Sequence, residues 1–131
     1  MRVINTAALW GCLLGFGLAS AAGAQSEAES EADREIGHLL GFVEASPCRF
    51  VRNGTVHAPA EGRAHLERKR KVLDRRGMIE SAEDFIRLAA TGSSITGRPY
   101  SVRCPEREPV ASADWLGAEL KRWRAAHPSP D

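Results

Sequence analysis

Two cysteines far apart in the chain, Cys48 and Cys104, constrain its fold more than any other feature. The sequence has three cysteines, and the third, Cys12, lies in an apolar N-terminal segment with the features of a cleaved leader. Removal of that leader leaves an even pair, with one possible connectivity, in a compartment that oxidises thiols. We therefore predict a disulfide between Cys48 and Cys104 that acts as a structural staple, since the chain has no C-x-x-C pair.

The N-terminal segment, residues 1–24, has the features of a secretory signal peptide. A basic start at Arg2 precedes an apolar run of about a dozen residues, and a small-x-small pattern ends at Ala24, where we place the cleavage site. A membrane-spanning helix takes roughly 20 residues, and no later segment is apolar enough to form one. The residues before Cys12 loosely resemble a lipobox, but Trp10 fits that motif poorly. We therefore predict a periplasmic protein of bacterial type without a membrane span.

The charge of the exported chain is balanced. Arg2 is the only charged residue of the leader, so its removal leaves 17 basic and 17 acidic side chains. A chain without net positive charge has no general attraction to polyanions, which argues against nucleic acid as a partner. Roughly 107 residues remain, which is enough for one domain with one core.

Hydrophobic spacing predicts a first helix from about Arg34 to the residue before Ser46, where Pro47 prevents continuation. Residues 25–33 alternate small and acidic side chains and are predicted to form an acidic lead-in, either solvated or a frayed helical turn. A hairpin follows, because the β-prone runs 48–52 and 55–57 flank an Asn-Gly dipeptide that accepts the positive φ angles of a type I′ turn.

Three further helices and a third strand are expected. The second helix covers residues 60–75, and Ser81 caps a short third helix that Gly92 ends. The alternation of residues 98–104 predicts a strand, which the disulfide would tie to the hairpin. Ser112 is the expected cap of the final helix.

The order of these elements predicts one α+β domain over residues 34–125, followed by a flexible tail at 126–131. The hairpin forces antiparallel pairing, so the hairpin and the third strand form a small antiparallel sheet. Such a sheet cannot bury itself, and we expect about four helices to pack against it. Phe50, Val102 and the two tryptophans of the last helix are the expected apolar cover.

Several segments carry a family resemblance, and they are Cys48-Arg49-Phe50-Val51-Arg52-Asn53-Gly54, His65-Leu66-Glu67-Arg68-Lys69, Ser81-Ala82-Glu83-Asp84-Phe85-Ile86, Ser93-Ser94-Ile95-Thr96-Gly97 with Tyr100 and Cys104-Pro105, and Trp115-Leu116. In this order they resemble the YfeK-like family, small exported bacterial proteins with a domain of unknown function. The resemblance covers roughly residues 35–124 and implies export and the fold. It implies no activity, because none is established for the family. One departure is Arg70, where an aromatic residue is expected.

Polar residues lie on the core-facing side of the second helix. At about 100° per residue, His65, Lys69 and Arg76 fall inside the arc of its apolar side chains. In a structural interpretation, His65 bonds a backbone carbonyl, while Lys69 covers the core with its stem and reaches water at its tip. In a functional interpretation, the same residues form an anion-binding or recognition site.

The hydroxyl-rich loop before the third strand is a second candidate site. Ser93, Ser94 and Thr96 lie between two glycines and close to Arg98 and Tyr100, so amide and hydroxyl donors are suited to an anion or a sugar. The alternative is a helix end followed by side-chain-to-backbone turns, which such residues form routinely.

Two other hypotheses concern these residues. A small envelope or cell-wall hydrolase would use Ser94 as nucleophile and His65 as base, but the chain has no G-x-S-x-G motif and no group to orient the histidine. The Thr-Gly-x-x-Tyr segment from Thr96 to Tyr100 resembles the Ser-Gly-x-x-Tyr loop with which exported lysozyme inhibitors of bacteria plug their target's active cleft. Those inhibitors are β-barrels, so the similarity concerns the loop alone.

The leading hypothesis is a non-enzymatic binding or interaction module of the cell envelope, because no acid, base and nucleophile assemble in the sequence. Its partner would be an envelope protein, glycan or anion. We expect no cofactor, and the four histidines show no paired ligand spacing, so no metal site is predicted. The candidate binding residues are His65, Lys69, Ser93, Ser94, Thr96, Arg98 and Tyr100.

Overall fold

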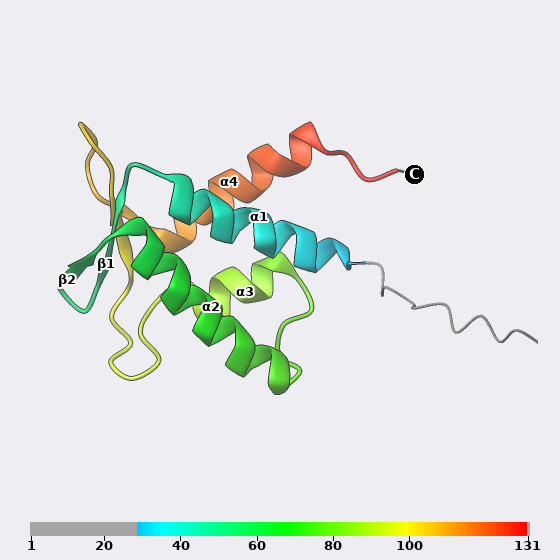
Figure 1. Ribbon diagram of the computed structural model, residues 1–131, viewed down its shortest axis with the longest axis horizontal. Helices are drawn as coiled ribbons and strands as arrows, with labels where there is room; N and C mark the ends of the chain where they lie inside the picture. The colour runs from blue at the N-terminus through cyan, green and yellow to red at the C-terminus, as the bar shows by residue number, and fades with distance from the viewer. Residues whose placement is uncertain (1–28, 131) are drawn as a thin grey trace, which may run out of the picture.

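In the described part of the chain, four α-helices and a four-stranded antiparallel sheet make up the fold (Figure 1). The computed structural model describes residues 29–130, so the predicted signal peptide lies outside the described residues. The arrangement is the predicted α+β class, with one strand more than expected. The elements are α1 (Glu31–Ala45), β1 (Arg49–Arg52), β2 (Thr55–His57), α2 (Pro59–Arg75), α3 (Ala82–Ala89), β3 (Ser101–Arg103), β4 (Val110–Ala111) and α4 (Ser112–Ala126).

Helix α1 begins at Glu31 rather than near Arg34. The Ser30 side chain accepts a hydrogen bond from the backbone N–H of Asp33 at 3.0 Å, which caps the helix. Glu31 and Asp33 also place negative charge at the N-terminus, where the helix dipole favours it. The last residues of the predicted lead-in therefore form the first turn of the helix. The buried apolar face is the predicted one and consists of Ile36, Leu39, Leu40 and Val43.

The sheet has the order β2-β1-β3-β4, and all neighbours are antiparallel. Asn53 and Gly54 adopt φ angles of 48° and 77°, which confirms the tight hairpin between β1 and β2. Strand β3 pairs with β1, as predicted. Strand β4 was not predicted, because its two residues are too few to show an alternating pattern.

Helices α2 and α3 begin where the sequence indicates. Pro59 occupies the first turn of α2, where its missing N–H costs no hydrogen bond. The chain reverses after this helix at Gly77, whose φ of 65° suits glycine. Ser81 caps α3 by accepting a hydrogen bond from the Asp84 N–H at 3.1 Å.

The predicted cap of α4 is wrong. Ala111 occupies the N-cap position, and Ser112 is the first residue of the helix. The Ser112 side chain is fully buried, and its Oγ has no hydrogen-bond partner among residues 29–130. Its backbone N–H instead donates to the carbonyl of Tyr100 at 3.0 Å, so this serine joins the helix to the segment before β3.

The core draws on all four helices and the two central strands. Phe50 and Val102 are buried, as expected, and Trp115 packs against the core beside Phe42. Trp123 behaves differently, because it stacks between two histidine rings at the surface end of α4. The largest fully buried side chains are Tyr100, Phe85, Ile36, Leu39, Leu66 and Leu116.

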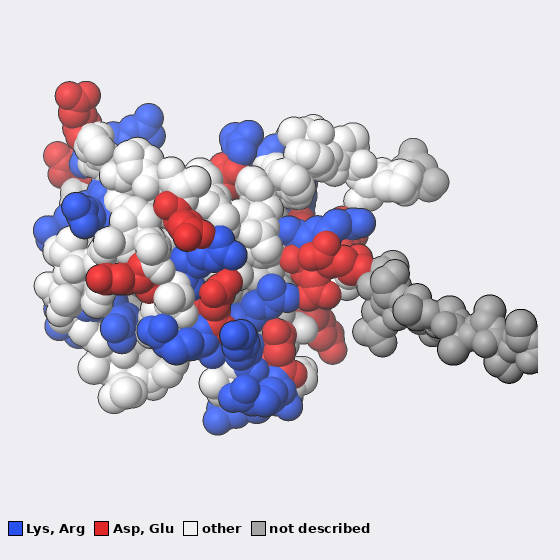
Figure 2. All heavy atoms as spheres, viewed as in Figure 1, with Lys and Arg blue, Asp and Glu red and all other residues white. Residues whose placement is uncertain are grey.

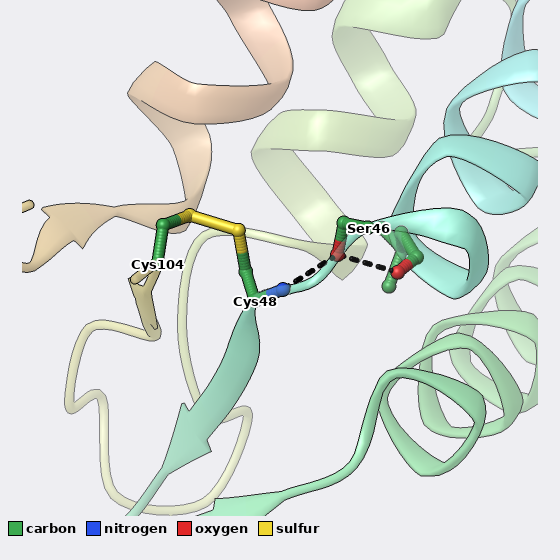
Figure 3. Close-up of a disulfide and its surroundings, with 4 residues drawn as sticks. Ser46, Cys48 and Cys104 are labelled. Atoms are coloured by element: carbon green, nitrogen blue, oxygen red, sulfur yellow. Dashed lines mark hydrogen bonds between the residues drawn. A yellow bond between two sulfur atoms is a disulfide. The ribbon is translucent and has the colours of Figure 1, made fainter. Parts of the chain in front are cut away.

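The predicted disulfide is present and ties the two central strands together (Figure 3). Cys48 directly precedes β1 and Cys104 directly follows β3, where the pairing of Arg49 with Arg103 brings the strand ends side by side. The Ser46 hydroxyl donates to the Val43 carbonyl at 2.9 Å and accepts from the Cys48 N–H at 3.4 Å. The disulfide therefore lies directly after the C-terminal end of α1, to which Ser46 connects it.

A charged cluster joins three helices at the opposite end of the fold. Glu35 of α1 is buried, and Arg124 of α4 donates to its carboxylate at 2.5 and 2.9 Å. The same guanidinium bonds Glu83 of α3. The buried carboxylate therefore depends on Arg124 for its charge compensation.

Candidate functional site

Helix α2 carries most of the candidate site. It packs very closely against β1, which brings its polar side chains next to the sheet. Gly62 permits this approach, since a Cβ atom at this position would lie only 3.0 Å from the Cβ of Phe50. Leu66, one turn later, is fully buried and anchors the helix in the core. His65 and Lys69 therefore lie at the edge of the packed interface, next to the segment that follows α3.

Tyr100 lies on the other side of this edge and is only 2% exposed. Its ring packs edge-on against Phe50, with ring centroids 5.2 Å apart. Its backbone N–H donates to the Thr91 carbonyl at 2.9 Å, and its own carbonyl accepts from Ser112. Both the ring and the backbone are therefore fixed, and the hydroxyl is held toward α2.

The hydroxyl of Tyr100 joins Lys69 and His65 in one hydrogen-bonded cluster. Lys69 Nζ donates to Tyr100 Oη at 3.3 Å and to the Gly92 carbonyl at 2.9 Å. Tyr100 Oη lies 3.0 Å from His65 Nε2. An ammonium group can only donate, so Tyr100 Oη accepts from Lys69 and its own proton is available to His65 Nε2. The structural interpretation is corrected in one respect, because the backbone carbonyl is bonded by Lys69 and not by His65.

Burial and positive charge set the protonation of this cluster. Desolvation, with the nearby charges of Arg52 and Lys69, lowers the pKa of His65 to about 4, so its imidazole is neutral at pH 7. Burial likewise lowers the pKa of Lys69 and raises that of Tyr100, with Arg52 opposing the latter shift. The cluster presents positive charge around a neutral histidine, which suits a negatively charged ligand.

The hydroxyl-rich loop uses two of its hydroxyls to hold its own shape. Ser93 Oγ accepts from the backbone N–H groups of Ile95 and Thr96, at 3.3 and 3.2 Å. The hydroxyl of Thr96 donates to the Asn53 side chain at 2.8 Å, which ties the loop to the hairpin turn. Gly97, at a φ of 72°, completes the reversal. Thr96 Oγ1 also accepts from the Arg98 N–H at 3.3 Å, so the side-chain-to-backbone interpretation describes both Ser93 and Thr96.

Two hollows meet along α2. The hairpin hollow has a volume of about 240 Å³ and the loop hollow about 390 Å³, and both include His65 and Arg68 in their walls. The hairpin hollow is lined by Phe50, Arg52, His57, Glu61, Gly62, Ala64, His65 and Arg68. The loop hollow is lined by His65, Arg68, Lys69, Val72, Leu73, Arg76, Leu88 and Ser94.

The structure brings together four of the predicted site residues and separates the others. His65, Lys69 and Ser94 line the loop hollow, and the Tyr100 hydroxyl bonds the first two. Arg98 is exposed and lines neither hollow.

Sequence reasoning missed three residues of the hairpin hollow: Arg52, His57 and Arg68. A signal for Arg52 existed, since strand alternation places it on the same face of β1 as the buried Phe50. His57 is paired with Phe50 across the hairpin. The sequence pattern does not indicate which face of the hairpin α2 covers. Arg52 and His57 were therefore not assigned to the site.

Two arginines of α2, Arg63 and Arg70, have acidic partners, whereas Arg52 and Arg68 of the hairpin hollow have none within residues 29–130. Arg63 pairs with Glu44 and Glu67, and Arg70 pairs with Asp33 at 2.5 Å and with Asp74 at 3.3 Å. Among the residues that the structure describes, Arg52 and Arg68 form no ion pair.

The geometry bears on the two activity hypotheses. His65 Nε2 is engaged by Tyr100, and Ser94 is exposed, with no hydrogen bond between Ser94 and His65 in the described part of the chain. A serine nucleophile therefore has no base in position in this arrangement. The buried side chain of Tyr100 also has no surface to present to a lysozyme cleft, so the inhibitor-like hypothesis loses its central contact.

Residues 29–130 contain neither a candidate membrane span nor a candidate metal cluster. In the stretch 29–130, no helix combines the length and apolar character needed to cross a bilayer. Within the same stretch, no three histidine, cysteine or acidic side chains cluster in a way that would hold a metal ion.

Fold and site together define a class: a small disulfide-linked α+β domain with a basic, tyrosine-centred site beside one helix. A family of unknown function (DUF5329) matches residues 30–124, and the chain belongs to this family. It is 40% identical over 62 residues to the uncharacterized protein YfeK of Salmonella typhimurium, a match that covers 47% of this chain and 50% of that relative. The resemblance found in the sequence is thereby confirmed. No solved structure matches the chain.

Proposed function

We propose that this protein is an exported, non-enzymatic binding protein of the bacterial envelope that holds an anionic envelope component along α2. The observation that carries the proposal is the row of cationic side chains around the two adjoining hollows. Arg52 and Arg68 line the hairpin hollow, while Lys69 and Arg76 line the loop hollow. Unpaired cations in concave sites attract negatively charged ligands, because partial desolvation strengthens the interaction.

The distribution of charge supports an anion over a neutral glycan. Figure 2 shows Lys and Arg side chains gathered over the C-terminal half of α2, although the chain as a whole is almost neutral. Glu61 is the one acidic residue in the walls of the two hollows, and it is engaged by His57 at 3.2 Å. Local positive charge on a neutral chain favours a specific anionic partner over general polyanion binding.

Export remains part of this proposal. The leader pattern of residues 1–24 supports it, and the disulfide supports it independently, because such bonds persist in oxidising compartments.

The test uses defined anionic components and two double variants with equal charge change. Vesicles of phosphatidylglycerol, lipopolysaccharide and peptidoglycan fragments are titrated into the disulfide-bonded chain. We expect Arg68→Gln/Arg76→Gln to weaken binding to at least one of these components about tenfold or more. The control variant, Lys71→Gln/Arg75→Gln, alters residues of the same helix that line neither hollow and should bind as the wild type does. No measurable binding, or equal weakening by both variants, would refute the proposal.

A further inference from the structure

The hairpin hollow differs from the loop hollow in most of its lining residues. Its walls come from β1, β2 and α2, and the close packing at Gly62 brings the guanidinium of Arg52 next to the helix. None of its four basic residues except His65 was expected to bind a ligand from the sequence. The positions of these basic side chains indicate the class of ligand that the hollow fits.

The donors converge from several directions. Arg52 comes from the sheet and Arg68 from the helix, while His57, at the end of β2, forms part of the wall. Arg52 Nε and His57 Nε2 are buried atoms without hydrogen-bond partners among residues 29–130. Because both atoms are closed off from water, a ligand would meet Arg52 through its terminal guanidinium nitrogens. A ligand at these terminal nitrogens would compensate the charge of Arg52, which has no acidic partner among residues 29–130.

We infer that the hairpin hollow binds a phosphate group, with Arg52 and Arg68 as its principal ligands. Guanidinium groups match both carboxylates and phosphates, so the choice between them depends on the number of donors. A carboxylate offers two oxygens in one plane and one charge. A phosphate offers oxygens in a tetrahedral arrangement, which accepts from a sheet arginine and a helix arginine on different sides.

This inference rests on the proposed function and specifies its ligand chemistry. The phosphate can belong to a soluble ester, such as a phosphorylated glycan, or to a lipid headgroup. The loop hollow bears on the source, because it adjoins the same two residues, His65 and Arg68, and contains Val72, Leu73 and Leu88. These aliphatic side chains suit an acyl chain, whereas Lys69, Arg76 and Ser94 of the same hollow suit the polar groups of a soluble ester, so experiment has to separate the two sources.

The first experiment measures binding of inorganic phosphate to the disulfide-bonded chain by calorimetry, with acetate and chloride at equal ionic strength as references. We expect phosphate to bind and acetate to bind at least tenfold more weakly. Arg52→Gln should weaken phosphate binding about tenfold or more. The affinity of Arg52→Lys should lie between those of Arg52→Gln and the wild type, because a lysine keeps the charge but lacks the paired donors of a guanidinium group. Arg49→Gln is the matched control, since Arg49 lies in the same strand, is exposed and lines neither hollow.

Thermal melts without phosphate separate binding from folding. A structural role for Arg52 would lower the melting temperature of Arg52→Gln in phosphate-free buffer, whereas a binding role removes only the stabilisation that added phosphate gives. Phosphate that binds no better than acetate, or Arg49→Gln that weakens it as much as Arg52→Gln, would overturn the inference. If phosphate fails while an anionic component still depends on Arg68 and Arg76, the proposed function stands without this ligand. If both fail, neither stands.

Two esters then identify the source. Glycerol 1-phosphate and lysophosphatidic acid share the phosphate monoester but differ in the acyl chain. Equal affinities indicate a soluble ester, and tighter binding of the lipid indicates a headgroup whose chain occupies the loop hollow. Binding of neither ester, at concentrations where phosphate binds, would refute recognition of a phosphate ester.

Discussion

Removal of the disulfide should cost a large part of the stability of this fold. Cys48 and Cys104 are separated by 56 residues. Closing a loop of that length removes conformational entropy from the unfolded chain, worth about 4 kcal/mol at 25 °C. A domain of this size is stable by roughly 5–15 kcal/mol in total. We therefore expect Cys48→Ala/Cys104→Ala to lower the free energy of unfolding by about 4 kcal/mol, to between about a fifth and about three quarters of its original value.

Urea denaturation followed by circular dichroism measures this loss. The oxidised wild type, the wild type in reductant and the double alanine variant are compared, and the two chains without the bridge should unfold at similar urea concentrations. Their transitions should also be steeper, since an unbridged chain exposes more surface on unfolding. Reductant should leave the alanine variant unchanged. A loss below about 1 kcal/mol in both unbridged chains would refute the loop-closure reasoning.

Three further predictions concern single residues. Burial lowers the pKa of His65 to about 4, whereas an unfolded histidine titrates near 6.5, so the unfolded state binds the extra proton between these values. The free energy of unfolding should therefore fall by about 2.5 kcal/mol as pH drops from 6.5 to 4, and urea titrations across that range should show a smaller fall in His65→Asn. Gly62→Val forces a side chain into β1 and should destabilise by about 1–3 kcal/mol, while Gly41→Val, with open space around it, should be close to neutral in the same thermal melts. Arg124→Ala leaves the buried carboxylate of Glu35 without its partner and should lower the free energy of unfolding by about 2 kcal/mol, a value reduced because the arginine side chain is itself 44% exposed. In a double-mutant cycle, Glu35→Gln should recover part of this loss, and strictly additive effects of the two substitutions would contradict the pairing.

Most of the fold was predictable because its signals are local. The apolar spacing of α1, the Asn53-Gly54 turn and the Ser81 cap each lie within a few residues, and the structure confirms them. The incorrect predictions also have physical causes. Ser112 has the chemistry of a cap, but the pairing of Ala111 in β4 places the cap one residue earlier and sends the serine into the core.

The candidate site was predictable only in part, because it depends on contacts between distant segments. The helical arc identified His65 and Lys69, but their common partner Tyr100 lies more than 30 residues away in the chain. The role of Arg52 depends on the packing of α2 against β1, which no local pattern encodes. The hydroxyls of Ser93 and Thr96 also form bonds that no local pattern specifies in full, the first within the loop and the second to Asn53 of the hairpin turn.

Tyr100 has one consequence for genetic studies of this family. Its ring fills the interior of the molecule, while its oxygen is bonded to the two polar residues of α2. A substitution at this position would lower cellular abundance and change ligand occupancy together, so a growth phenotype alone cannot assign it a role. Variant libraries should therefore be scored for protein level and for binding in parallel, with Tyr100→Phe as the informative change, because it deletes the oxygen and leaves the ring in place.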